Sequence, residues 1–208
     1  MNILEVLEDL TGSLRDVVEA RMAQTWTALP VIVKKASDGH TAQMQSAINQ
    51  MVYDVDGVTL LSAAMAEFQD APVHFAGGGG VSSTHPVNSG DEGIALFMSR
   101  GQDNWHEQGG FQDPVDARMH HLSDARFLPG GRSNPRKMNP APSSDSAQHR
   151  SDDGNHVHDI HPTNGLHSAS TVKVAVTSGN SNTFHTPDGI RSLATLIAHN
   201  CGLPGSGF

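Results

Sequence analysis

The sequence has one cysteine, Cys201, and few aromatic residues, only 5% of the chain. A single cysteine excludes an intrachain disulfide framework and any metal site built on several cysteines. No run approaches the roughly 20 apolar residues that a membrane-spanning helix needs. The first residues also lack the basic flank and apolar core of a signal peptide. We therefore expect synthesis in a cytoplasm, without export by the general secretory route.

Apolar and basic residues are scarce as well. Hydrophobic residues make up 37% of the 208 positions, beside 21 glycines and 11 prolines. A core along the whole length of a monomer is therefore not expected, and part of the chain must be disordered or ordered by other chains. Lys and Arg number 13 against 22 Asp and Glu, a formal net charge of −9. This charge argues against a phosphate-neutralising surface, so no nucleic-acid partner is expected.

Helical periodicity marks the first segment, residues 1–24. Apolar residues recur at steps of three and four between residues 2 and 22, which predicts an amphipathic helix. The members of this stripe are Ile3, Leu7, Leu10, Leu14, Val17, Val18 and Met22. Two interpretations remain open: the helix packs on its own domain, or it docks on a neighbouring protein or drives trimerisation.

The apolar period changes to two in the next segment, residues 25–130. Alternation over residues 42–49 and apolar runs at 30–33, 58–61 and 94–98 predict short strands. Asp-Gly pairs at residues 38–39 and 56–57 supply turns between them. Four or five short strands predict a small closed barrel of OB type. Residues 99–129 are expected to be loop-like, so the chain as a whole is expected to be mainly β.

Composition changes twice more towards the C-terminus. Residues 131–154 are rich in Gly, Pro, Ser and Asn and predict a linker. Residues 155–208 hold many histidines and a strictly alternating segment at 171–177 with three valines on one face. We expect this strand to find no partner within its own chain, whereas three copies around an axis would supply a sheet.

Motifs for catalysis are not found. The sequence contains neither Gly-x-Ser-x-Gly nor His-Glu-x-x-His. The glycine run at residues 77–80 lacks the Gly-Lys-Ser/Thr that a phosphate-binding loop needs. No segment beyond the barrel has the length of a lysozyme domain. We therefore expect a protein that is not an enzyme.

His156 and His158 are the candidate metal ligands. On a strand, residues two apart share one face at a spacing of about 6.6 Å. Two imidazoles do not make a site, but three chains would supply six nitrogens. Zinc prefers a tetrahedral set, so six imidazoles point to iron, cobalt or nickel. His161 and His185 remain possible substitutes for one of the two ligands.

An ordered set of short motifs resembles the N-terminal domain of the baseplate central spike proteins of contractile-tailed phages. The motifs are Ala71–Gly80, His85–Val87, Gly90–Gly93, Trp105, Arg118–Ala125 and Phe127–Gly130. The resemblance covers about residues 25–132. The His-x-His pair has more residues after it here than in that family, where it usually lies near the chain end.

The resemblance implies a homotrimer. In that family, OB-type domains form a collar under the tail tube, and residues 155–208 would correspond to an intertwined trimeric β-helix or β-prism spike and tip. The spike pierces the host outer membrane when the sheath contracts, and the partners are the tail hub and tail tube proteins. One iron ion per trimer would be held by His156 and His158 of three chains. The protein would be made in the host cytoplasm and reside in the tail baseplate of the virion.

A second function remains open from the residues alone. An OB-type barrel is also a common binding module for saccharides or single-stranded nucleic acid. The acidic charge and the shortage of aromatic residues for stacking both argue against it.

Overall fold

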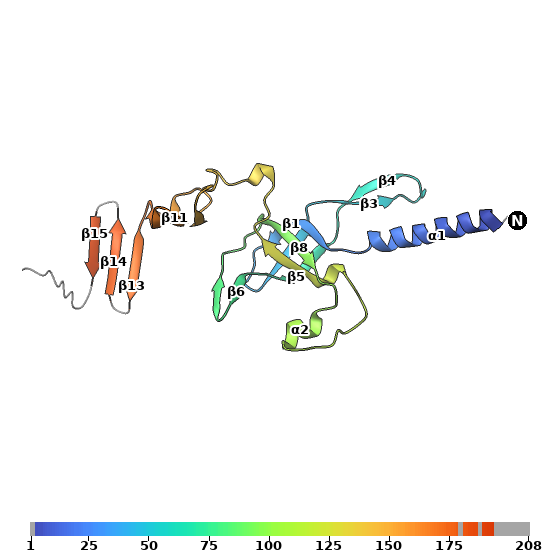
Figure 1. Ribbon diagram of the computed structural model, residues 1–208, viewed down its shortest axis with the longest axis horizontal. Coiled ribbons are helices and arrows are strands. Elements are labelled where there is room, and N and C mark those ends of the chain that lie inside the picture. The colour runs from blue at the N-terminus through green and yellow to red at the C-terminus, as the bar shows by residue number, and fades with distance from the viewer. Residues whose placement is uncertain (1–2, 179–180, 187–188, 194–208) are drawn as a thin grey trace, which may run out of the picture. The chain divides into compact units, whose positions relative to one another are not determined.

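The computed structural model describes residues 3–178, 181–186 and 189–193 (Figure 1). The chain divides into two compact units, Met1–Ser133 and Asn134–Phe208. Over the described residues, no helix combines the length and apolar character needed to cross a membrane.

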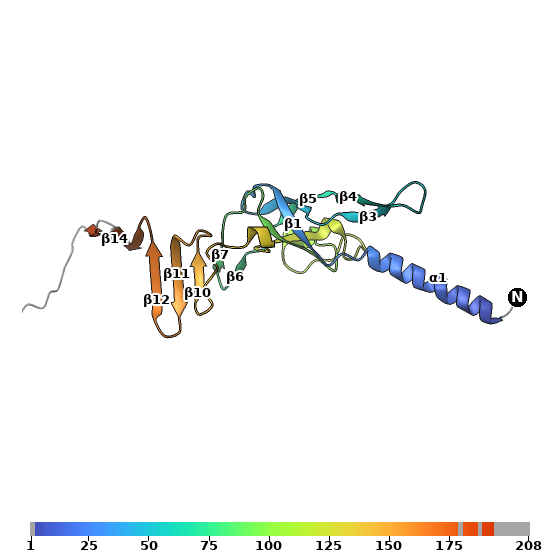
Figure 2. The same cartoon turned by 90° about the horizontal axis from the view of Figure 1, so that it is seen from above.

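The N-terminal helix is present as predicted. Helix α1 spans Ile3–Ala23, and every side chain from position 10 to position 23 is exposed. The last turn is closed by Thr25, whose backbone N–H donates to the carbonyl of Met22 at 3.0 Å and whose hydroxyl donates to the carbonyl of Arg21 at 2.9 Å. Both views draw α1 as a straight rod (Figures 1 and 2). From Leu10 to Met22, the apolar stripe is therefore not buried in its own chain.

A curled five-stranded sheet forms the body of the first unit. Its strands, in spatial order, are β5 (Glu67–Pro72), β2 (Thr41–Ser46), β1 (Ala28–Lys35), β8 (Glu92–Phe97) and β9 (Ala125–Pro129). Neighbouring strands are antiparallel. The edge strands approach each other through a parallel bridge between Val73 and Phe127, and the backbone N–H of His74 donates to the Phe127 carbonyl at 2.7 Å. The sheet thus curls into a half-barrel.

Alternating side chains of these strands fill the inside of the curl. On β8 the odd-numbered residues are buried and their neighbours are half-buried, which is the period of a strand with one core face. Phe127 and Met44 are fully buried, and the Phe68 and Phe97 rings meet edge to face with centroids 5.6 Å apart. The buried apolar residues are Val31, Val33, Ala42, Met44, Met65, Phe68, Ala71, Val87, Ala95, Phe97, Ala125 and Phe127.

Two hairpins leave the body of the sheet. The first pairs β3 (Gln50–Tyr53) with β4 (Leu60–Ala63), and the second pairs β6 (Ala76–Gly78) with β7 (Val81–Ser83). The glycine run at 77–80 makes the second hairpin: Gly79 and Gly80 have φ angles of 60° and 82°, which favour glycine. Its glycines therefore serve a β-turn.

The segment between β8 and β9 is less loop-like than predicted. It contains helix α2 (Asp103–Gln108) and the 3-10 turn η1 (Leu122–Asp124), and β9 itself falls within the expected loop. The guanidinium of Arg126 lies 4.6 Å from the centroid of the Trp105 ring. This contact fastens α2 to the sheet.

The second unit contains two three-stranded antiparallel sheets. One is built from β10 (Ala147–Arg150), β11 (His156–His161) and β12 (Gly165–Ser170) (Figure 2). The other is built from β13 (Val174–Ser178), β14 (Ser181–Thr186) and β15 (Gly189–Leu193) (Figure 1). Among the side chains described in this unit, none is buried. Each sheet is therefore a single layer within this chain.

Two expectations for this unit need correction. The alternating segment 171–177 was expected to lack a partner, but its strand β13 begins at Val174 and pairs with β14 of the same chain. The expected linker 131–154 contains the 3-10 turn η2 (Asn134–Arg136) and β10. Strands β10 and β14 were not predicted because backbone hydrogen bonds between strands need no apolar pattern in the sequence.

Candidate functional site

His156 and His158 lie on one face of the sheet β10–β11–β12. They occupy alternating positions of β11, and both side chains are exposed. The register sets His158 opposite His149 of β10 on one side and opposite Ser168 of β12 on the other. His156 lies opposite Ser170. Three imidazoles and two hydroxyls therefore share one exposed face.

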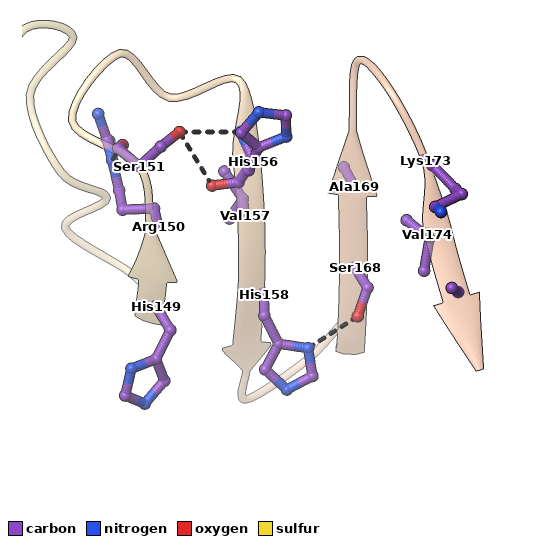
Figure 3. A pocket seen from close by; sticks show the side chains of 11 residues that line it. His149, Arg150, Ser151, His156, Val157, His158, Ser168, Ala169, Lys173 and Val174 are labelled. Atoms are coloured by element: carbon purple, nitrogen blue, oxygen red, sulfur yellow. Dashed lines mark hydrogen bonds between the residues drawn. The ribbon is translucent and has the colours of Figure 1, made fainter. Parts of the chain in front are cut away.

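Serine hydroxyls orient both candidate ligands. Nδ1 of His156 lies 2.8 Å from Oγ of Ser170, and Nδ1 of His158 lies 2.7 Å from Oγ of Ser168. Figure 3 shows the His158 ring turned towards Ser168 through this bond. With Nδ1 engaged, Nε2 is the nitrogen that each ring offers to a ligand. Hydrogen bonding of the second nitrogen is the usual way in which proteins hold metal-binding imidazoles.

A polar turn fixes the start of β11. The hydroxyl of Ser151 accepts from the backbone N–H of His156 at 3.1 Å and donates to Oδ1 of Asp153 at 2.6 Å. The same carboxylate accepts from the backbone N–H of Asn155 at 3.0 Å. These bonds, with that of Ser151 first, lower the pKa of Asp153. The turn needs Gly154, whose φ of 73° is unfavourable for other residues.

Cationic side chains border the histidine face. Arg150 and Lys173 line the same open depression as His149, His156 and His158 (Figure 3). The guanidinium of Arg150 donates to the carbonyls of Pro140 at 2.7 Å and Ala141 at 3.1 Å. Arg150 therefore holds the chain before β10 in place.

The two substitute ligands lie elsewhere. His161 is on the opposite face of β11, and its Nδ1 accepts from the backbone N–H groups of Thr163 and Asn164, both at 3.1 Å. His185 is exposed on β14 of the other sheet, opposite Val174. Neither shares the face of His156 and His158.

The described residues of one chain do not complete a metal site. In the part of the chain that the structure describes, no group of three or more His, Cys, Asp or Glu side chains is arranged to hold a metal ion. His156 and His158 have the donor chemistry and the second-nitrogen hydrogen bonds of metal ligands, so they fit a metal if further ligands join them, and other chains could supply these.

Sequence reasoning missed three members of this face, His149, Ser168 and Ser170. His149 lies in the segment predicted to be a linker, and its pairing with His158 depends on strand register. The signal that was available is the Ser-x-Ser spacing of β12, which matches the His-x-His spacing of β11.

The first unit holds an ionic cluster around a buried carboxylate. Asp124 is the one charged residue that is fully buried among the described residues. It accepts from Nε of Arg118 at 2.8 Å and from the backbone N–H of Gln102 at 3.1 Å. Burial alone would raise the pKa of Asp124, but these hydrogen bonds outweigh burial and lower it. The carboxylate is engaged in holding the β8–β9 connection, which is a structural role.

Comparison with known proteins places the first unit in a phage context. Residues 29–130 match the family model described as the phage protein Gp138 N-terminal domain. No curated protein matches the chain. The match begins in β1 and ends just after β9, so it covers the curled sheet and leaves the histidine face outside. It supports a structural protein of a phage and a component of the virion.

Proposed function

We propose that the chain is the central spike of a contractile phage tail, a homotrimer that pierces the host outer membrane when the sheath contracts. The observation that carries the proposal is the second unit. It follows a phage domain, yet among its described side chains none is buried. Single sheet layers of this kind need a second layer, and further copies of the chain can supply it.

The first unit serves in this proposal as an OB-type barrel in a collar. An OB-fold is a five-stranded, partly open barrel. The strand order β5–β2–β1–β8–β9, with a parallel bridge from Val73 after β5 to Phe127 on β9, agrees with such a barrel. The collar would dock on the tail hub and tail tube proteins, in the baseplate of the virion.

The second unit serves as the spike, in which three chains intertwine as a β-helix or β-prism. An exposed apolar row crosses its first sheet, because Ala147, Ile160 and Leu166 lie opposite one another on three adjacent strands. Ile160 is 59% exposed and Leu166 is 67% exposed. Three copies of such a row around an axis would cover one another, which removes apolar area from water in every chain.

The metal proposal rests on the histidine face. Nε2 of His156 and Nε2 of His158 from three chains would supply six nitrogens to one iron ion per trimer. The ion would add stability that exists only in the assembled trimer, because unassembled chains lack the full ligand set.

The protein has no catalytic task in this proposal. Its contact with the host outer membrane is transient, and its acidic net charge of −9 does not suit nucleic acid. The alternative, a binding module for saccharide or single-stranded nucleic acid, would not require a trimer.

Mass and metal content of the purified full-length protein test the proposal. Light scattering should give three times the chain mass at micromolar concentration, and elemental analysis should give one iron per three chains. A double variant, His156→Ala with His158→Ala, should lose the metal. A folded monomer would contradict the spike, whereas a trimer without metal after iron-replete expression would contradict only the metal site.

A further inference from the structure

From residue 10 onwards, where its side chains are described, helix α1 leaves its apolar stripe unburied in its own chain. Leu10, Leu14 and Val17 are 54%, 59% and 61% exposed, and every described side chain of the helix is exposed. Isolated helices are marginal in water, and most helical stability in proteins comes from packing an amphipathic face. A helix of 21 residues with this face uncovered therefore calls for an occupant.

The stripe follows a heptad. From Ile3 to Val17 its apolar positions are separated by alternating steps of four and three, which is the a/d pattern of a left-handed coiled coil. In heptad notation the a positions are Leu7 and Leu14, and the d positions are Ile3, Leu10 and Val17. The pattern runs through nearly the whole helix, and Gly12 falls at an f position on the outside.

Charge is confined to the outside of this heptad. The flanking e and g positions are uncharged: Leu4, Val6, Thr11, Ser13, Val18 and Ala20. The charged residues fall at b, c and f, except Arg21 at the last a position; they are Glu5, Glu8, Asp9, Arg15, Asp16 and Glu19. Up to Ala20, copies of an acidic chain can therefore meet through this face without bringing like charges together.

The residue types at a and d favour a coiled coil of more than two helices. Leucine at a with a β-branched residue at d shifts coiled coils from dimers to trimers or tetramers. Here a holds Leu7 and Leu14, while d holds Ile3 and Val17, with Leu10 between them. Uncharged e and g positions widen the apolar face, as each helix needs when it contacts two neighbours.

We propose that α1 forms a parallel, in-register, three-stranded coiled coil with α1 of two further copies of this chain. The inference rests on the proposed trimer and adds a device that aligns its three chains at the N-terminal end. Threefold symmetry makes the three helices parallel. A helix of this length has a side surface of about 1,000 Å², so burying a, d, e and g covers about 1,700 Å² in three chains. This is the size of a standard stable interface.

Disulfide cross-linking tests the arrangement directly. In a Cys201→Ser background, Val17→Cys places thiols at a d position near the proposed axis, whereas Glu19→Cys places them at an f position on the outside. Mild oxidation of the purified full-length protein should join chains of the Val17→Cys variant and leave the Glu19→Cys variant unjoined.

A second pair of variants tests the energetics. Leu14→Ser removes an a residue, whereas Met22→Ser removes an exposed apolar residue at a b position of the same helix. Leu14→Ser should shift the concentration at which the trimer dissociates upward by roughly tenfold or more, and Met22→Ser should leave it unchanged.

The outcomes separate this inference from the proposed function. A monomeric wild-type mass contradicts the trimer itself. A trimeric mass without Val17→Cys cross-links overturns the coiled coil alone and indicates that the stripe docks on another protein. Cross-linking of both cysteine variants to the same extent would also overturn it, because a specific helix face would then not be involved.

Discussion

The two units of this chain contrast in how they are held together. The first unit folds a curled sheet around a set of apolar residues that is buried within one chain. The second unit pairs strands just as regularly, yet none of its described side chains is buried. Backbone hydrogen bonding is therefore common to both units, whereas among the described side chains a buried core is found in the first unit and not in the second. The contrast supports the proposal that the second unit gains its burial between chains.

Polar groups follow the same division. In the first unit, Asp124 is buried and fixed by Arg118, which stabilises a specific loop against the sheet. In the second unit, exposed groups such as Asp153 and Ser151 bond to nearby backbone and close turns. Local turns need no core, so they can form between strands whose side chains are exposed within one chain.

The largest effect is expected at Phe127. Its ring is fully buried, and the first unit closes where its backbone meets Val73 and His74. Phe127→Ala should lower the free energy of unfolding of this unit by about 3–5 kcal/mol. Thermal unfolding followed by near-ultraviolet circular dichroism measures it.

Gly93→Ala supplies a companion test of the same core. A β-carbon at Gly93 would overlap the Phe127 ring and lie 2.6 Å from the carbonyl oxygen of Leu128. The variant should therefore also lose stability. If both variants unfold like the wild type, the self-contained core of the first unit is wrong.

Asp124 should give the next largest effect. Asp124→Asn keeps the shape but removes the charge that faces Arg118, and hydrogen bonds to charged groups contribute about 1.5–3 kcal/mol. The folded pKa of Asp124 is lowered, so its contribution is complete above the unfolded value of about 3.9 and is lost as pH falls through the folded value. The variant should be less stable than the wild type at neutral pH.

The pH dependence serves as the control. As pH falls through the lowered pKa of Asp124, the wild-type carboxylate becomes protonated as well, so the difference between the two proteins should shrink. Chemical denaturation at pH 7 and at low pH measures both stabilities. A difference that stays constant with pH would show that the amide disturbs packing and that the charge is not the cause.

Much of the first unit could be predicted from the sequence, because helices and strands with one buried face carry apolar residues at a regular spacing. Helix α1 follows its apolar stripe to within a residue or two, β1 and β8 follow their apolar runs, and β2 follows its alternation. β5 escaped prediction because its burial pattern is irregular and Asp70 has a φ of 50°. β9 escaped because it is short and lies beyond a long connection.

The second unit could be predicted less well, for the same physical reason. Strands β10, β12 and β14 are rich in polar residues and are paired through their backbones, so they leave no apolar period. The His-x-His pair was visible as a spacing, but the row that joins His149, His158 and Ser168 depends on register between strands. The turn at residues 151–155 joins β10 to β11, so it sets the register of His149 against His158.

The apolar row of the second unit should matter only in the assembly. Ile160→Ser with Leu166→Ser removes two exposed side chains, each contributing about 1 kcal/mol per chain if the trimer covers its remaining exposed area. The expected result is weaker assembly with an unchanged first unit. Sedimentation equilibrium over a range of concentrations measures the effect, and Val115→Ser, an exposed apolar residue of the first unit, is the control. Equal behaviour of both variants would mean that the row is not covered.

The smallest effect is expected at Asp153, where the second unit relies on hydrogen bonds in water. Asp153→Ala removes the acceptor for Ser151 and Asn155, so the turn before β11 should open more often. Asp153→Asn keeps an acceptor oxygen, so in this variant the turn should open less often than in Asp153→Ala.

Because the folded pKa of Asp153 is lowered, the contribution of its carboxylate to the turn is complete above the unfolded pKa of about 3.9. It is lost as pH falls through the folded pKa, when the carboxylate is protonated. Amide hydrogen exchange of residues 151–158 measures the opening, and exchange in β1 and β8 should not change. Faster exchange throughout both units would contradict the division, because a solvated turn would then be stabilising the core of the other unit.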